Sequence, residues 1–207
     1  MTISRTRMAT ALTAFAAATS ILSACSSADQ GATAARSTPD GGHGGHAASS
    51  AASSAAVTAA FNDTDVTFAT MMYPHHAQAV DMANMVDGKN ASTDVVGLAA
   101  EIKGAQQPEM DAFTRLLASW GKPAPSATMA HAMDGMMTPD QMQRLNTLRG
   151  AEFDREWLTM MIEHHRGAIA MADTELASGV NEEARRIASA IKAGQQAEIG
   201  RMQKLLG

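Results

Sequence analysis

An internal duplication restricts the fold of this chain more than any other feature of its sequence. Residues 65–117 align with residues 154–206 without a gap, at a constant offset of 89 residues and with 17 identities in 53 positions. Both copies contain the phrase Met-Met-x-x-His-His and end in Leu-Leu. A repeat of this length indicates that one structural unit occurs twice and that the two units bury their apolar faces together.

Each unit is predicted to be a pair of helices. Apolar residues recur at helical spacing over about 62–87 and over its copy, about 151–178. The second helices are predicted from about 92 to 121 and from about 181 to the last residue. Because the connections within each pair are short, we expect two antiparallel hairpins, which together form an all-α, four-helix bundle.

The stretch between the two hairpins, residues 121–150, is long enough to cross the bundle. It is predicted to contain a short helix that begins with Thr138 as cap and Pro139 in the first turn. Pro74 and Pro108 lie inside predicted long helices, where each removes one backbone hydrogen bond. We expect both helices to continue through their prolines, with a local kink.

The N-terminal region is interpreted as a targeting segment and a tether. An apolar run at 9–24 follows two arginines and ends in Leu-Ser-Ala before Cys25, which is typical of a bacterial lipoprotein signal. We therefore expect a signal peptide over 1–24, a lipidated Cys25 that begins a flexible Ser/Ala/Gly-rich tether over 25–60, and a folded domain over 61–207. The alternative is an ordinary secretory signal with a chance cysteine.

Cysteine count and charge exclude several classes of function. Cys25 is the only cysteine, so its lipidation leaves no thiol for a disulfide, a thiolate metal site or a nucleophile. Without residues 1–24 the chain has 14 basic and 21 acidic side chains, a net charge of −7 with no basic stripe, which disfavours nucleic-acid binding. His43 and His46 in the tether could capture a metal loosely or be incidental.

The repeated His-His phrase predicts a metal site inside the bundle. On a helical projection His75 lies at the centre of the apolar stripe and His76 on its flank, and the copy places His164 and His165 in the same way. Only one histidine of each pair is therefore expected to point into the bundle. Together with the methionines on these faces, the candidate ligands are His75, His76, His164, His165, Met71, Met72, Met82, Met160, Met161 and Met171.

The second helices bring polar side chains to their own apolar faces. Gln106 and Glu109 share a face with Ile102, and Gln195 and Glu198 occupy the equivalent face of the copy. A buried carboxylate or amide is unfavourable unless something satisfies it, and the candidates are the inward histidines, a metal ion, or both. These four residues are expected to orient the imidazoles or to join them around a metal.

Methionine and histidine together favour copper. Thioether and imidazole suit Cu(I) best and allow Cu(II) through histidine, whereas zinc, calcium and magnesium prefer other ligand sets. The stretch between the hairpins carries a further group that we expect to capture metal, namely Met129, His131, Met133, Met136 and Met137. The competing interpretation is that methionines on helical faces only fill the core and that a His–Glu pair is a satisfied polar network.

Three motifs of the chain are distinctive: Met-Met-x-x-His-His-x-x-Ala-x-x-Met-Ala, which occurs twice, Gly-Met-Met-Thr-Pro-Asp-Gln-Met at 135–142, and Gly-Ala-Glu-Phe-Asp at 150–154. With these motifs, the chain resembles the bacterial secreted "domain of unknown function 305" family over roughly 61–207. The resemblance implies a ferritin-like fold and, because some members are periplasmic copper-binding proteins, copper handling at the paired histidines. Glu163 departs from the family pattern, in which proline is common there. No helix carries the Glu-x-x-His motif of di-iron enzymes, so we expect no enzyme.

These observations predict an extracytoplasmic protein, anchored to the membrane through lipid on Cys25, that binds and sequesters or buffers copper. The alternative from another class is a metal-free helical interaction module, in which a His/Gln/Glu layer holds the helices in register. A weaker alternative is a metal-dependent oxidase. No protein partner can be predicted.

Overall fold

The computed structural model describes residues 60–128 and 133–207. These residues belong to one compact unit, Ser53–Gly207. The predicted signal peptide and the tether up to residue 59 lie outside the described residues, as do Met129 and His131.

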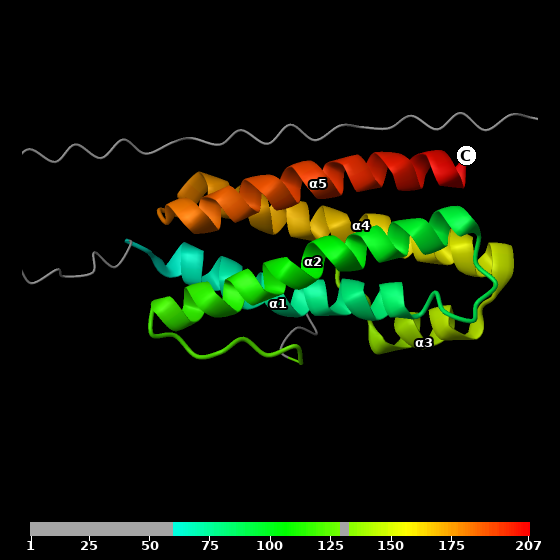
Figure 1. Cartoon of the computed structure of the whole chain (residues 1–207), viewed down its shortest axis with the longest axis horizontal. Coiled ribbons are helices and arrows are strands. Elements are labelled where there is room, and N and C mark those ends of the chain that lie inside the picture. The colour runs from blue at the N-terminus through cyan, green and yellow to red at the C-terminus, as the bar shows by residue number, and fades with distance from the viewer. Residues whose placement is uncertain (1–59, 129–132) are drawn as a thin grey trace, which may run out of the picture. The chain divides into compact units, whose positions relative to one another are not determined.

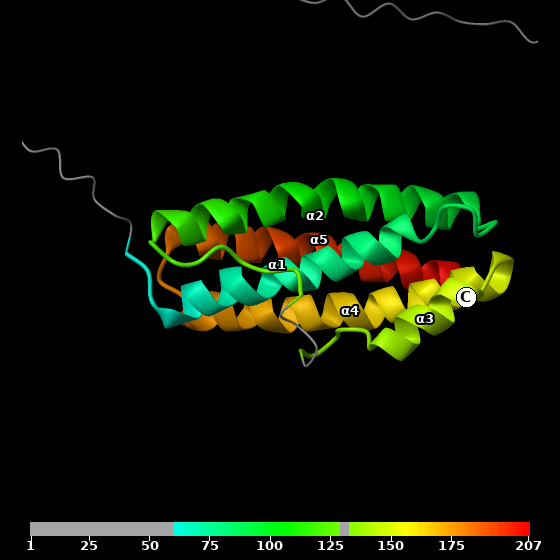
Figure 2. The ribbon, with the colours of Figure 1, turned by 90° about the horizontal axis from the view of Figure 1, so that it is seen from below.

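Five helices make up the described chain, so the predicted all-α class is confirmed. They are α1 (Asp63–Asn84), α2 (Thr93–Ser119), α3 (Pro139–Thr147), α4 (Gly150–Ser178) and α5 (Glu182–Leu206). The four long helices lie roughly along one axis, with α1 and α2 forming one antiparallel hairpin, α4 and α5 the other, and α1 packed against α4 (Figure 1, Figure 2). After α2 the chain turns back, and the described residues up to 128 run along the outside of the bundle (Figure 1).

Local signals start these helices close to the predicted positions. The Asn62 side chain accepts hydrogen bonds from the first turn of α1, and Asp65 bonds back to the Asn62 backbone, which completes a capping box. Thr138 begins α3 with a capping box of its own and a proline in the first turn. Pro74 and Pro108 lie inside α1 and α2, which continue through them.

Equivalent contacts recur in the two copies of the repeat. The Asp65 carboxylate accepts a hydrogen bond from the Asn181 backbone amide at 2.9 Å, and its counterpart Asp154 accepts one from the Ser92 amide at 2.9 Å. Each aspartate lies in the first helix of one hairpin and bonds the turn within the other hairpin. The two hairpins are therefore joined at both ends of the bundle by the same contact.

Candidate metal centre

A layer of polar side chains divides the core into two apolar clusters. One cluster contains Met82, Phe153 and Trp157, and the other contains Phe68 and Phe113. On each long helix the polar residues lie between the stretches that contribute to the two clusters. The buried members of this layer are His75, His76, Gln106, His164, His165 and Gln195.

The inner histidines, His75 and His164, meet at the centre of this layer. Their ring centroids are 3.8 Å apart, and the ring planes are inclined by 43°. Both side chains are fully buried, and none of their four ring nitrogens has a hydrogen-bond partner in the described part of the chain. Because buried polar atoms are nearly always bonded, these nitrogens mark a place that a further ligand would satisfy.

The environment keeps both inner imidazoles neutral. Burial, and then the proximity of His76 and His165, lower the pKa of His75 to about 3. Burial, and then the proximity of His75, hold the pKa of His164 well below its usual value. A neutral imidazole has one nitrogen lone pair free to bind a metal, so neither histidine must lose a proton first at neutral pH.

The flanking histidines bond to glutamates on the second helices. His76 Nε2 lies 2.8 Å from Glu109 Oε2, and His165 Nε2 lies 2.7 Å from Glu198 Oε2. The Nδ1 atoms of both flanking rings are buried without a partner among the described residues. A neutral ring that donates from Nε2 to a carboxylate carries its lone pair on Nδ1, which can then bind a metal.

The glutamines of the layer are also unsatisfied. Neither amide atom of Gln106 has a hydrogen-bond partner in the described part of the chain, and the same holds for Gln195 Oε1. Of the 12 buried side-chain atoms without partners among the described residues, nine belong to the six residues of this layer. The unsatisfied polar atoms are therefore concentrated where the two copies of the repeat meet.

The linker between the hairpins, residues 133–137, crosses over this layer. The backbone of Gly135 lies so close to α4 that a Cβ atom there would approach the Glu163 carbonyl oxygen to 2.8 Å, and a Cβ on Gly167 would meet the Asp134 oxygen at 2.1 Å. On α1 the Gln78 amide bonds Met137 twice, donating to its carbonyl at 2.8 Å and accepting from its amide at 2.7 Å. Two neighbouring helices thus hold the linker in place.

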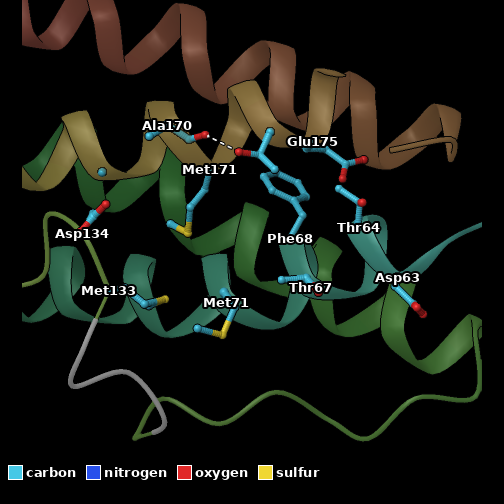
Figure 3. A pocket seen from close by; sticks show the side chains of 12 residues that line it. Asp63, Thr64, Thr67, Phe68, Met71, Met133, Asp134, Ala170, Met171 and Glu175 are labelled. Carbon is cyan, nitrogen blue, oxygen red and sulfur yellow. Dashed lines mark hydrogen bonds between the residues drawn. The ribbon is translucent and has the colours of Figure 1, made fainter. Parts of the chain in front are cut away.

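The candidate methionines fall into three groups. Met72 and Met161, each three residues before an inner histidine, are fully buried. Met82 and Met160 are packed into the apolar cluster around Trp157, whose indole nitrogen donates to the Met82 carbonyl at 2.9 Å. In the third group, Met71 and Met171 line a cavity between α1 and α4, together with Met133 from the linker (Figure 3).

The linker methionines that follow Met133 lie elsewhere. Met136 and Met137 line a second, smaller cavity beside α1 and α3. Met137 is buried in the same apolar cluster as Trp157, whereas Met136 remains partly exposed.

The side chains available at the centre of the layer limit which metal ions this layer could bind. Within residues 60–128 and 133–207 no three His, Cys, Asp or Glu side chains are grouped so that they could bind a metal ion. An ion held by the inner histidines would therefore take its remaining ligands from thioethers or amides. Such a set suits a soft ion such as Cu(I) and does not suit zinc or calcium.

Three residues that shape this region were not predicted from the sequence. Gln78 forms hydrogen bonds with the linker, and Gly167 has no side chain, so the linker backbone can lie against α4. Glu175 is a fully buried acid that lines the cavity beside Phe68. Each differs sharply from its partner in the repeat, since Gln78 pairs with Gly167 and Glu175 pairs with Val86. These residues could have been found by looking for repeat positions at which the two copies differ in side-chain size or polarity.

Comparison with known proteins identifies the family. The family described as "Domain of unknown function (DUF305)" matches residues 65–206. The chain belongs to the DUF305 family. No curated protein matches it.

Solved DUF305 structures share this fold. A secreted DUF305 protein from Streptomyces coelicolor is 31% identical, with a TM-score of 0.64 over 69% of this chain and 91% of that one. A DUF305 fragment from Deinococcus radiodurans is 32% identical, with a TM-score of 0.65 over 70% of this chain and 97% of that one. In the described part of this DUF305 chain, no helix is both long and apolar enough to cross a bilayer.

Copper-bound structures also resemble this DUF305 chain. CopM in its Cu(II)-bound form is 30% identical, with a TM-score of 0.61 over 69% of this chain and 95% of that one. CopM in its Cu(I)-bound form is 31% identical, with a TM-score of 0.58 over 68% of this chain and 94% of that one. Silver-bound forms of CopM have the same overall fold.

Proposed function

We propose that this DUF305 protein binds copper and sequesters or buffers it outside the cytoplasm. The observation that carries the proposal is the pair of fully buried inner histidines, with ring centroids 3.8 Å apart, whose four ring nitrogens have no hydrogen-bond partner in the described part of the chain. A protein core without a ligand there would leave a large desolvation penalty uncompensated. The crystal structures of the related CopM with Cu(I), Cu(II) and silver support the same conclusion.

The residues proposed to hold the metal are those of the central layer. His75 and His164 supply imidazole nitrogens, whereas His76 and His165, which are not grouped with them as metal ligands in the described part of the chain, flank this pair within the layer. Their glutamate partners, Glu109 and Glu198, fix the orientation of the flanking rings. Gln106 and Gln195 offer further acceptors in the same layer.

Thioethers complete the proposed set. Met72 and Met161 lie one helical turn from the inner histidines and are fully buried, so they favour Cu(I) over Cu(II). Met82 lies seven residues from His75, which places it about 10 Å further along the helix axis, within the apolar cluster. We therefore assign Met82 to packing. We propose the same role for Met160, which lies one turn before His164 but is buried in the apolar cluster that contains Trp157.

The proposed location is extracytoplasmic, with a lipid on Cys25 as the anchor and the stretch up to residue 60 as a tether. The secreted relative from Streptomyces coelicolor supports export. Neither a nucleophile–base pair nor a di-iron ligand set was found in the sequence, and the relatives bind metal, so we propose a binding protein without catalytic activity.

A competitive Cu(I) titration of the compact unit, residues 53–207, against a chromogenic chelator under reducing conditions tests the proposal. We expect tight binding of at least one Cu(I), lost in the double variant His75→Leu/His164→Leu. The matched control is Met82→Leu/Met160→Leu, which changes two buried thioethers outside the layer and should retain binding. Binding that survives the histidine double variant would refute the proposed site. If the parent protein binds no Cu(I) and the histidine double variant changes only its stability, the result would support the alternative, a metal-free helical module with a structural His/Gln/Glu layer.

A further inference from the structure

Identical methionines of the two repeats occupy different environments. The repeat pairs Met71 with Met160 and Met171 with Met82. Met82 and Met160 are buried in the apolar cluster around Trp157, whereas Met71 and Met171 are partly exposed and line a cavity. The end of the α1–α4 contact that contains Met82 and Met160 is therefore filled by side chains, and we call it the closed end. The end that contains Met71 and Met171 has a cavity, and we call it the open end.

The closed end owes its packing to residues that the open end lacks. Phe153 and Trp157 are fully buried there, together with Leu145 from α3. At the open end the counterparts of the two aromatic residues are Thr64 and Phe68, which are smaller. The chain has only one α3, and it packs on the closed end (Figure 1). The open cavity, of about 580 Å³, is what remains when these groups are absent.

Three thioethers from three separate segments face this cavity. Met71 comes from α1, Met171 from α4 and Met133 from the linker, and their side chains gather toward one end of the cavity (Figure 3). Thioethers bind soft monovalent ions without first losing a proton. Three of them converging on one open space form a donor set for Cu(I) that the sequence alone did not bring together.

The charge of the cavity favours a cation. Its ionisable lining residues are Asp63, Asp134 and Glu175, with no basic side chain among them. Because burial and Asp65 raise the pKa of Glu175 to about 8, that residue keeps its proton at neutral pH, and the attraction for a cation comes from the two aspartates. Glu175 is fully buried, and neither of its carboxylate oxygens has a hydrogen-bond partner in the described part of the chain. Its counterpart in the closed half is Val86, so the bundle does not need an acid at this position.

The inner end of the cavity reaches the central layer. Met71 lies one helical turn before His75, and Gly167 lies one turn after His164. The backbone of Asp134, which also lines the cavity, lies beside the His75 ring. Because both inner histidines are fully buried beneath the linker, a metal ion needs a path to them, and this cavity begins within one turn of each.

We propose that the open cavity is the port through which Cu(I) enters, binding first to Met71, Met133 and Met171 before it passes to the inner histidines. This inference rests on the proposed function and names the entry route to the same centre. The transfer exchanges thioether ligands for imidazole ligands. The ion stays Cu(I) throughout, and no electron moves.

Transfer kinetics test the port. Cu(I) is passed from its chromogenic chelator complex to the compact unit in a stopped-flow instrument, and the loss of complex colour is followed. We expect the triple variant Met71→Leu/Met133→Leu/Met171→Leu to load at least tenfold more slowly than the parent, with a final affinity changed less than threefold. The matched control is Met82→Leu/Met160→Leu, the same repeat positions at the closed end, which should load at the parent rate. Equal rates for parent and triple variant, or equal slowing by the control, would overturn the proposal.

A second measurement separates failure of the port from failure of the central site. Silver nitrate, a redox-inert substitute for Cu(I), is added to the His75→Leu/His164→Leu variant in chloride-free buffer. The methionine methyl resonances are then followed by NMR. The port predicts shifts at Met71, Met133 and Met171 and none at Met82 or Met160.

The outcomes of the two measurements differ in what they refute. Absence of methyl shifts at the three port methionines would overturn the port, even if the parent binds Cu(I) at its histidines. Shifts at those methionines in a protein that shows no histidine-dependent Cu(I) binding would refute the proposed function and leave a thioether site at the cavity.

Discussion

Acid should destabilise the metal-free protein through its buried inner histidines. In the unfolded chain a histidine binds a proton below about pH 6.5, whereas burial first, and the neighbouring His76 and His165 second, hold the pKa of His75 at about 3 in the fold. Between these two values the unfolded state holds one more proton than the folded state. Stability is therefore fully present above pH 6.5 and falls as the pH is lowered toward 3.

The size of this effect follows from the pKa of His75. Each pH unit below 6.5 lowers the free energy of unfolding by about 1.4 kcal/mol for that one histidine, or by about 2 kcal/mol at pH 5. His164, whose pKa is also depressed, adds to the loss in the same direction. In the variant His75→Leu the contribution of His75 is absent, so the stability should depend less steeply on pH by about 1.4 kcal/mol per unit.

Urea denaturation followed by circular dichroism, in the presence of a metal chelator, measures this dependence between about pH 5 and pH 7.5. Gln106→Leu is the matched control, because it removes a buried, unsatisfied but non-titrating group from the same layer. It should change stability by a similar amount at every pH. An unchanged pH dependence in His75→Leu would show that the inner histidine is protonated in the fold and would refute the neutral metal-binding form.

Three further predictions concern stability, each measured by urea denaturation. Gly167→Ala should destabilise by about 1–3 kcal/mol because its Cβ meets a linker oxygen, whereas Gly194→Ala, with open space around it, should stabilise by up to about 1 kcal/mol. Glu175→Val, the residue found in the other repeat at Val86, should stabilise, and more so at pH 8 than at pH 5. Burial first, and Asp65 second, raise the pKa of Glu175 to about 8, so the fold keeps a proton that the unfolded chain loses above about pH 4.5. Asp65→Ala should destabilise by about 2–4 kcal/mol, because backbone amides on two segments lose their acceptor; a smaller effect would mean that water replaces the carboxylate.

Much of the fold was predictable because its signals are local. Helix starts depend on a few adjacent residues, and Asn62, Thr138 and Pro139 act in the structure as their types indicate. Helical periodicity also placed His75 and His164 on inward faces, where the structure has them in contact. The repeat then implied that the two inner histidines have equivalent surroundings.

The partners of the flanking residues were not predictable in this way. Glu109 and Glu198 share a face with inward residues, which predicted the inner histidines, a metal ion, or both as their partners, and for the histidines this prediction was wrong. The structure pairs them with His76 and His165. Which of two adjacent histidines a glutamate reaches depends on the distance and rotation between helices, and these are set by packing along their whole length.

The sequence by itself determined the helices, their caps, the two hairpins and the central histidine layer, since each depends on residues close together in the chain or on an internal repeat that aligns without a gap. Only the tertiary structure decided which half of the bundle is open. The repeat makes Met71 and Met160 equivalent, but the two copies are joined by a single linker with a single α3, which covers one end of the α1–α4 contact. A covering segment that occurs once packs on only one of the two related halves, so the thioethers of the other half stay accessible.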